Sequence, residues 1–487
     1  MENIPFKWRV SQIFGDKSSI EKIADQDKIS SLEFDSTGNY IAVGDRGGRV
    51  ILFQSNHVAN ESEEESDLDE EELMKEEEKE KNEENEEEEE EEEEKSKQKK
   101  SLQYKFYSEF QSHEPEFDYL KSIDIEEKIN KIQWIKRRNR SHLLLSTNDQ
   151  TIKLWKIFSK EKELVTEFNK ERQENESINN PKDLLFPKTQ VEEISKEAYN
   201  KRTYGSAHAY NINSISLSSD DEVFISSDEL RINLWHLERT DKSFNIVDLK
   251  PEDLEQLSEV ITCSQFHPNE SNQFIYSLSK GVIHLGDLRQ SAKCLNSVKV
   301  FEDEETSLND SFFTEIMSNI SDIKYSPCGR YILSRNYTTL KVWDVKMESK
   351  PLATLCVHDF SHSKLCELYE NDFIFDKFEC NWSGDGKYAI TGSYENYYYL
   401  FDWKKNKGML IDGSKTTKIY SKFYETQNPN ENSNNIFSNN NKLSYDSDNV
   451  DFSKKIFNVS WNPYNPFIAV AATNILYLYT GKVGTKK

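Results

Sequence analysis

The sequence predicts an all-β protein in which seven small sheets close into a ring, a seven-bladed propeller. Three observations carry this prediction. A unit of three apolar strands recurs seven times, its third strand often ends in an aromatic residue, and glycine, asparagine and aspartate mark its turns. Short strands rich in β-branched and aromatic residues are typical of all-β repeats. One such sheet cannot bury both of its apolar faces, whereas a closed ring of seven can.

The first unit shows the pattern in full. Strands are expected at 29–34, 40–43 and 50–53, separated by the turns 35–38 and 44–48. The other six units span 129–157, 212–237, 260–289, 320–345, 378–403 and 456–480. Residues 6–14 precede the first unit and have strand composition, so we expect them to be the outer strand of the last blade. The segment 6–54 would then hold this closing strand and the first blade, and 129–480 the remaining blades.

Three inserts interrupt the repeat. The insert 57–101 contains a run from Glu61 to Glu94 with 24 acidic residues and 3 lysines, which contributes −21 to the net charge of −26. So much like charge with little apolar content predicts disorder. The insert 158–203 is charged and partly helical in pattern. The insert 426–449 is rich in asparagine, which predicts a flexible loop between the sixth and seventh blades.

A projecting β-hairpin is predicted at 103–128. Two strand-like runs, 103–110 and 116–125, flank the segment 111–115, and both carry aromatic residues. Apolar surface on a projecting element usually marks a partner site. The alternative, that this hairpin lies flat on the propeller wall, stays open.

No motif predicts catalysis. The segment 44–49 (GDRGGR) lacks the Lys-Ser/Thr of a phosphate-binding loop and is interpreted as a turn. His358 and His362 have the spacing of a helical metal site but no further ligands nearby, and are interpreted as loop residues. We therefore expect no enzyme activity, no catalytic residue, no metal and no cofactor.

The cysteines and the hydropathy bear on the compartment. Six cysteines without a C-x-x-C pair indicate free thiols in a reducing compartment, so a cytoplasmic and possibly also nuclear protein is expected. No apolar run of the roughly 20 residues that a membrane span needs is present. Basic residues at 136–140 are not interleaved with aromatics, so neither a nucleic acid nor a membrane is an expected partner.

Acidic residues at the edges of blades are candidates for binding. Asp25, Asp228, Glu229 and the segment 252–255 fall there, and their convergence would create a field that attracts basic segments. Asp149 and Asp344 are interpreted instead as caps of blade turns.

Several long strings resemble one family. They are 110–130 (FQSHEPEFDYLKSIDIEEKIN), 230–237 (LRINLWHL), 239–251 (RTDKSFNIVDLKP), 364–372 (KLCELYEND) and 375–380 (FDKFEC). These strings closely resemble the B-family, WD-repeat regulatory subunits of protein phosphatase 2A, from about residue 8 to residue 480 outside the inserts. The polyacidic run is foreign to the family pattern.

The resemblance implies a non-catalytic subunit of a heterotrimeric Ser/Thr phosphatase. Its propeller would dock on a HEAT-repeat scaffold subunit and present phosphoprotein substrates to a catalytic subunit. In the family a projecting hairpin reaches the scaffold, which here implies contacts by Phe117, Tyr119 and Leu120. Substrate-binding positions implied by the resemblance are Asp25, Arg46, Tyr210, Asp228, Glu229, Glu255 and Leu257.

Two positions depart from the family pattern. Asn211 stands where a histidine is usual, and Glu229 where an aspartate is usual, which puts the preference for particular partners in doubt. The alternative reading is a stand-alone acidic propeller that binds or chaperones basic proteins such as histones.

Overall fold

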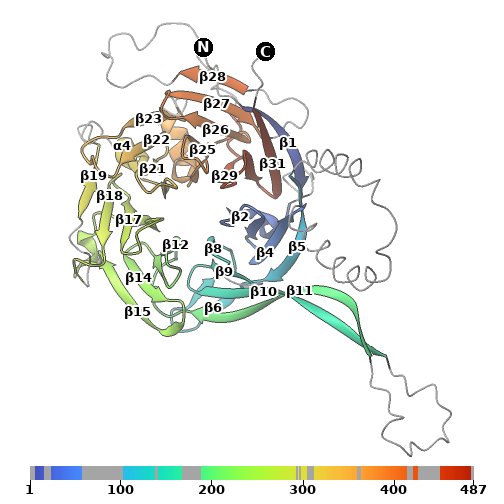
Figure 1. Cartoon of the computed structure of the whole chain (residues 1–487). Coiled ribbons are helices and arrows are strands. Elements are labelled where there is room, and N and C mark those ends of the chain that lie inside the picture. The colour runs from blue at the N-terminus through green and yellow to red at the C-terminus, as the bar shows by residue number, and fades with distance from the viewer. Residues whose placement is uncertain are drawn as a thin grey trace, which may run out of the picture.

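The computed structural model is a ring of seven antiparallel sheets (Figure 1). It describes residues 6–15, 23–56, 102–137, 141–166, 188–291, 294, 298–303, 312–358, 364–413, 421–425 and 450–483. Each sheet is one blade whose strands follow one another from the ring axis outward. The predicted seven-bladed propeller is confirmed. The inserts 57–101 and 426–449 lie outside the described residues.

The blades have the following strands. Blade 1 consists of β2 (Ile29–Phe34), β3 (Tyr40–Asp45), β4 (Arg49–Ser55) and β5 (Tyr104–Gln111). Blade 2 consists of β8 (Lys131–Ile135), β9 (His142–Thr147), β10 (Ile152–Thr166) and β11 (Lys188–Tyr204). Blade 3 consists of β12 (Ser214–Leu217), β13 (Val223–Ser227), β14 (Arg231–His236) and β15 (Arg239–Asp248). Blade 4 consists of β16 (Ile261–Phe266), β17 (Gln273–Leu278), β18 (Ile283–Asp287) and β19 (Lys299–Phe301).

The remaining three blades differ at their outer edges. Blade 5 consists of β20 (Asp322–Tyr325), β21 (Tyr331–Arg335), β22 (Thr339–Asp344) and β23 (Ala353–Cys356). Blade 6 has a fifth strand and consists of β24 (Cys380–Trp382), β25 (Tyr388–Gly392), β26 (Tyr397–Asp402), β27 (Lys407–Asp412) and β28 (Ser421–Glu425). Blade 7 consists of β29 (Ile456–Trp461), β30 (Phe467–Ala472), β31 (Ile475–Val483) and the N-terminal β1 (Phe6–Phe14).

Apolar residues between neighbouring blades hold the ring together. Alternate side chains of a strand point to opposite faces of its sheet, so each blade offers apolar residues to both neighbours. The described residues form one apolar cluster at each of the seven blade–blade junctions. No helix among the described residues is long and apolar enough to cross a membrane.

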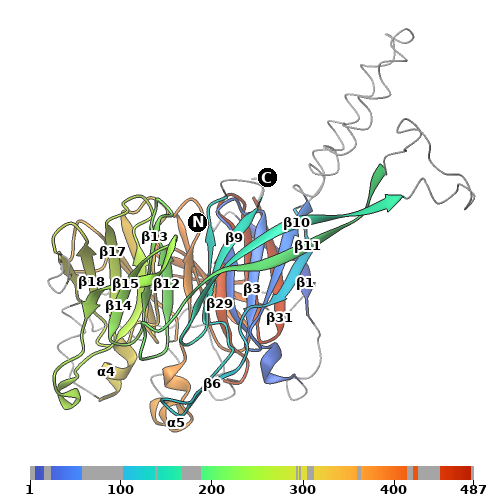
Figure 2. The same ribbon diagram turned by 90° about the horizontal axis from the view of Figure 1, so that it is seen from below.

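The elements that matter for binding lie at one end of the ring, here called the loop face. It is the end where the innermost strand of each blade begins. The short elements there each precede an innermost strand: η2 (Asp25–Asp27), the pair β6 (Glu116–Asp118) and β7 (Ile123–Ile125), η4 (Leu254–Gln256), α4 (Phe312–Ser318), α5 (Leu365–Glu370) and η6 (Phe373–Phe375). Figure 2 shows α4, α5 and β6 projecting from this face.

The predicted hairpin at 103–128 is wrong in its first half. Residues 104–111 form β5, which pairs with β4 and completes blade 1. Only β6 and β7 pair with each other, over three residues each. Tyr104 in this run is only 1% exposed and donates its hydroxyl to the Gly38 carbonyl at 2.6 Å, whereas Phe106 is 61% exposed.

The long projecting element is a hairpin of blade 2, here called the arm. Strand β9 pairs with β10 only from Ile152 to Ile157, whereas β10 and β11 continue to pair as far as Thr166 and Lys188. Figures 1 and 2 show this ribbon extending well beyond the ring. The expectation of partly helical structure at 158–203 is therefore wrong for the described residues, and 167–187 lie outside them.

The glycine-rich segment 44–49 contains the turn between β3 and β4, as expected. Gly48 has a φ of +80°, and a Cβ atom there would lie 2.2 Å from the His113 carbonyl oxygen. A side chain is excluded at this position both by the left-handed backbone and by the neighbouring chain.

Candidate functional site

The substrate-binding residues implied by the sequence all lie at the loop face, on blades 1, 3 and 4 and the links before them. Their positions are η2 (Asp25), the β3–β4 turn (Arg46), the link before β12 (Tyr210), the β13–β14 turn (Asp228 and Glu229), η4 (Glu255) and the link after η4 (Leu257). The ring thus brings to one face residues that are up to 232 positions apart in the sequence. They differ, however, in exposure and in charge balance.

At the blade 1 end, acidic and basic groups offset one another. Asp25 accepts hydrogen bonds from Lys28 Nζ at 2.6 Å and from Arg46 Nη1 at 2.8 Å. These two contacts, with Lys28 the stronger cause, lower the pKa of Asp25 below its usual value. Nearby Lys128 is half-buried, and burial together with the charge of Arg46 lowers its pKa. This end therefore offers cations as well as a carboxylate that is already paired.

At the blade 3 and 4 end, exposed carboxylates stand beside apolar groups. Tyr210 is 37% exposed and Leu257 is 36% exposed, and Glu229 and Glu255 are both at the surface. The Glu229 carbonyl accepts the Ile261 N–H at 2.7 Å, which holds the β13–β14 turn against the link that carries Glu255 and Leu257. Such a surface can pair with a basic segment and also accommodate an apolar side chain.

The link that carries Tyr210 is fixed to both neighbouring blades. The Ile212 N–H donates to the Asp149 carbonyl in blade 2 at 2.8 Å. The Asn213 side chain donates to the Ile261 carbonyl in blade 4 at 2.9 Å. Asn211, between Tyr210 and Ile212, is exposed. Tyr210 and the Glu229 turn are therefore held beside one link, the one that carries Glu255 and Leu257.

Asp228 is not part of this surface, which corrects the sequence-based assignment. Its side chain is completely buried. The carboxylate lies 2.9 Å from His208 Nδ1 and accepts the backbone N–H groups of Leu230 at 2.8 Å and Arg231 at 2.7 Å. Its role is to close the β13–β14 turn from inside the blade.

The buried network continues from His208 into blade 3. His208 Nε2 lies 2.6 Å from Ser226 Oγ, which also accepts the indole N–H of Trp235 at 2.9 Å. A signal for this structural role was present in the repeat itself. The residue that follows the second strand is Asn148 in blade 2 and Asn336 in blade 5, and both side chains cap their turns in the same way.

The residues implied for scaffold contact lie on the short β6–β7 hairpin. Phe117 is 44% exposed, and Tyr119 and Leu120 at its turn are 86% and 98% exposed. The Asp118 carboxylate accepts the N–H groups of Leu120 at 2.9 Å and Lys121 at 3.1 Å, which fixes the turn that presents them. The structure places these residues on the loop face and separate from the arm, which sequence reasoning did not identify as a projection.

Other candidate chemistry is not supported. No group of three His, Cys, Asp or Glu side chains within the described ranges could hold a metal ion. His358 is buried with its Nε2 3.1 Å from Ser393 Oγ, and burial holds its pKa well below the usual value; His362 lies outside the described residues. All six cysteines are free thiols.

Comparisons with known proteins identify the family. No protein-family model matches the chain. The chain is 45% identical over 97% of its length to the B-type regulatory subunit of protein phosphatase PP2A from Schizosaccharomyces pombe, and covers 98% of that protein. It is 46% identical over 94% of its length to the B beta isoform of the 55 kDa regulatory subunit of serine/threonine-protein phosphatase 2A from Carassius auratus, and covers 94% of it.

A third relative, from Dictyostelium discoideum, indicates the same family. It is the serine/threonine-protein phosphatase 2A regulatory subunit phr2AB, 42% identical over 98% of the chain and 98% of the relative. Similarity at this level over nearly the whole of each chain, together with the seven-bladed ring, leaves the stand-alone histone-binding propeller without support. The chain belongs to the B family of protein phosphatase 2A regulatory subunits and is a non-catalytic, regulatory component of that Ser/Thr phosphatase.

Proposed function

We propose that this regulatory subunit acts by holding phosphoprotein substrates near the catalytic subunit. Its loop face binds a segment of a phosphoprotein through Tyr210, Glu229, Glu255 and Leu257, with Asp25 and Arg46 at the blade 1 end. Other elements attach the propeller to the scaffold subunit, and a separate catalytic subunit removes the phosphate. Tethering raises the local concentration of the phosphosite to the order of mM for a short connection.

The observation that carries this proposal is the exposed acidic and apolar surface held together at the blade 3 and 4 end. Glu229 and Glu255 attract basic segments, because opposite charges steer association and select partners. Tyr210 and Leu257 supply apolar contact area next to these charges.

The cysteines, all free thiols, support a further proposal that the protein works in the cytoplasm and also in the nucleus. Imaging a fluorescent fusion of the protein would check this localisation.

The Glu229→Lys variant should weaken substrate binding and leave assembly intact. Reversing an exposed charge at the centre of the surface turns attraction into repulsion, and we expect a loss of binding of about tenfold, or 1.4 kcal/mol. The measurement is co-purification of phosphoproteins together with the phosphatase subunits. Loss of the phosphatase subunits from this variant would contradict the division of roles.

We further propose that the arm, rather than the short hairpin alone, reaches the scaffold subunit. The resemblance to the family implies a projecting hairpin as the docking element, and the arm is the ribbon of this protein that extends beyond the ring. Removing residues 162–193 and joining Glu161 to Ile194 through Asn-Gly keeps all pairs of β9 with β10 and the pairs of β10 with β11 from Ile152 to Glu161. This variant should melt like the wild type and lose most of the co-purifying scaffold subunit.

A point variant tests the short hairpin separately. Tyr119 and Leu120 can both be replaced with serine with little loss of buried area, because they are 86% and 98% exposed. If they contact the scaffold subunit, the double variant should co-purify less of it at unchanged melting temperature. If this variant and the shortened arm both retain the scaffold in full, both docking assignments are refuted. Deleting all of 103–125 is not a usable test, since it removes β5 from blade 1.

A further inference from the structure

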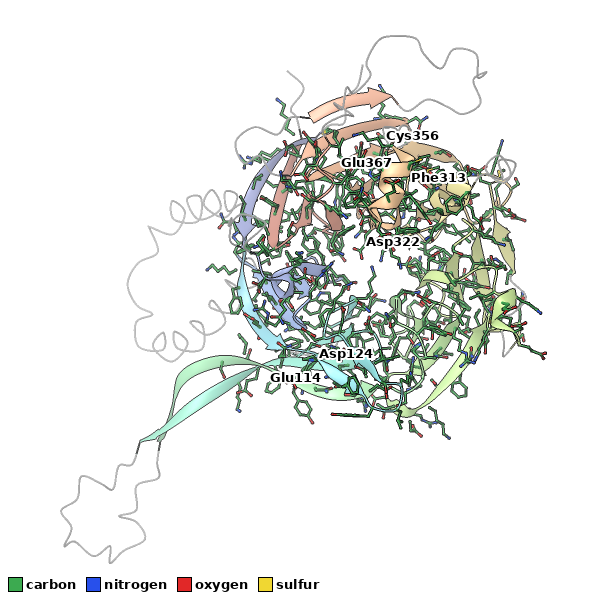
Figure 3. The ribbon with its side chains drawn as sticks, turned by 180° about the vertical axis from the view of Figure 1, so that it is seen from behind. Glu114, Asp124, Phe313, Asp322, Cys356 and Glu367 are labelled. Carbon is green, nitrogen blue, oxygen red and sulfur yellow. The ribbon has the colours of Figure 1, made fainter. Side chains whose placement is uncertain are left out.

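A cavity lies at the end of the ring opposite the loop face, here called the far face, where the innermost strands end. It is formed between blades 2 and 3 at the root of the arm, and its volume is about 370 Å³. The far face is turned to the viewer in Figure 1, whereas Figure 3 shows the loop face, on which Asp124, Phe313 and Glu367 are labelled. The cavity is therefore separate from the surface proposed for substrates.

The cavity combines apolar and cationic side chains. Its apolar lining comes from the ends of β8, β9 and β10 and from the β14–β15 turn: Ile135, Leu143, Leu154 and Leu237. Two further lining residues, Lys136 and Lys201, are exposed lysines. A volume of this size falls in the range of ligand sites, about 300–1,000 Å³. The cavity can thus accept an apolar side chain whose neighbours are acidic.

Cations outnumber carboxylates around the cavity. The segments 136–140 (KRRNR, of which 138–140 lie outside the described residues) and 201–202 supply six cations, against four carboxylates at 220–222 and 238. The Glu238 carboxylate is already paired, since Arg202 Nη2 lies 2.5 Å from its Oε2 and Lys201 Nζ lies 3.9 Å from its Oε1. In a chain of net charge −26, this part of the far face attracts acidic segments.

Further cations lie between the cavity and blade 1. Burial, together with the charges of Arg137 and Lys196, lowers the pKa of His142 to about 4. The His142 ring centroid is 4.2 Å from that of Tyr40 in blade 1. Lys196 Nζ lies 5.3 Å from the ring centroid of Tyr107 on β5. Arg137 and Lys196 are therefore at the junction of blades 1 and 2, on the side of the cavity that faces blade 1.

The polyacidic insert 57–101 leaves the ring next to this junction. Strand β4 runs from the loop face to the far face, so the insert leaves blade 1 and returns to it at the far face. The two ends are joined, because the Asn56 N–H donates to the Gln103 carbonyl at 2.8 Å and the Asn56 side chain accepts the Gln103 N–H at 3.1 Å. Just before this point, Gln54 Nε2 donates to the Tyr40 hydroxyl at 3.1 Å. The insert thus begins one blade away from the cavity.

The insert has the composition and the length to reach the cavity. The acidic run 61–94 contains only three apolar residues, Leu68, Leu73 and Met74. The chain from Asn56 to Leu68 spans up to about 40 Å when extended. Packed sheets lie about 10 Å apart, so this length is sufficient to pass from blade 1 to the junction of blades 2 and 3.

We propose that the cavity on the far face is a docking site for the acidic insert of this same chain. An apolar side chain of the segment 68–74 (LDEEELM) enters the cavity, and neighbouring carboxylates pair with Lys136, Lys201 and the basic turn. Exposed ion pairs contribute little each, so the buried side chain supplies most of the affinity and the charges select an acidic segment. This inference concerns the chain alone and does not depend on the proposed function.

The test uses a chain that lacks residues 61–94 and a fluorescein-labelled peptide with the sequence of 63–78, measured by fluorescence anisotropy. The deletion removes no described residue. The shortened chain should bind the peptide, and the wild type should bind it about tenfold more weakly, because its own tethered insert competes at a concentration of the order of mM. A peptide with serine in place of Leu68, Leu73 and Met74 keeps the charge and should also bind about tenfold more weakly.

Two charge-reversal variants of the shortened chain locate the site. Lys136→Glu/Lys201→Glu should lower the affinity for the peptide about tenfold, because repulsion replaces attraction at the cavity. The matched control is Lys121→Glu/Lys250→Glu, which makes the same change of charge at two exposed lysines near the loop face and should bind like the shortened chain. All four side chains are exposed, so both variants should melt at the same temperature as their parent.

The possible outcomes each decide the proposal. Absence of binding to the shortened chain at about 1 mM peptide, the effective concentration of a tethered segment, would overturn it. Equal binding of the serine peptide, or an equal loss in the loop-face control, would reduce the interaction to unspecific charge attraction. If the wild type bound the peptide as tightly as the shortened chain, the cavity would be open to acidic segments of other proteins, and the insert would not be its occupant.

Discussion

Replacing Asp228 with alanine should lower the free energy of unfolding by about 4 kcal/mol, since each buried donor left without an acceptor costs about 1–3 kcal/mol. The carboxylate satisfies two backbone N–H groups and the Nδ1 atom of His208 inside blade 3. Alanine leaves all three without an acceptor in a site that water does not reach. Urea unfolding followed by tryptophan fluorescence measures the effect.

Two variants make this prediction specific. Glu229→Ala changes the next residue, whose side chain is exposed, and should alter stability by less than about 0.5 kcal/mol. Asp228→Asn retains an acceptor of the kind that Asn148 and Asn336 provide in blades 2 and 5, so it should lose much less than alanine. Equal stability of Asp228→Ala and Glu229→Ala would return Asp228 to the set of surface residues.

The contrast between Asp228 and Glu229 shows what the sequence can and cannot predict about the site. The acidic pair is visible as charge at a blade edge, and the resemblance to the family marks both residues. Which of the two faces solvent depends on the turn geometry, since the first residue after the strand turns inward to cap the turn. Comparison with blades 2 and 5, where Asn148 and Asn336 cap the same turn, indicates this role.

The fold was predictable because its signal is repeated. Alternating apolar strands and turn residues occur seven times, and local errors in one unit do not change the ring. The segments 104–111 and 158–203 were misassigned, although the described residues of both are strands. A strand that pairs within a blade and a strand that projects from it carry similar residues, and only the pairing partner distinguishes them.

The arm also shows that a charged sequence pattern does not by itself predict a helix. Lys160, Glu197 and their neighbours have the charged composition of an exposed helix, yet they pair across β10 and β11, with Lys160 Nζ 3.1 Å from Glu197 Oε1. Intrinsic propensity is a weak signal, and the continuation of a paired hairpin from blade 2 outweighs it.

The second large expected effect on stability concerns Trp8, which lies on the strand that closes the ring. Strand β1 pairs with β31 from Phe6↔Val483 to Phe14↔Leu476, the outer position in blade 7 that its sequence suggested. The Trp8 side chain is 6% exposed, and its ring centroid lies 5.4 Å from that of Trp461 in an edge-on arrangement. Trp8→Ala should therefore cost about 3–5 kcal/mol, measured by urea unfolding, whereas Arg9→Ala on the exposed side of the strand should be nearly neutral.

Deleting residues 1–15 should have a still larger effect, because β1 joins the two ends of the ring. Gln12 exchanges hydrogen bonds with the Tyr104 backbone in blade 1, at 2.9 Å and 2.6 Å, and Phe14 packs on Phe53 at a centroid distance of 4.5 Å. Without β1, blade 7 keeps three strands and β31 becomes an unpaired edge, which favours association between chains. We expect a lower melting temperature and a concentration-dependent aggregate in size-exclusion chromatography. A monomeric protein that melts like the wild type would show that the other six junctions alone hold the ring, and that the N-terminal strand serves some purpose other than closure.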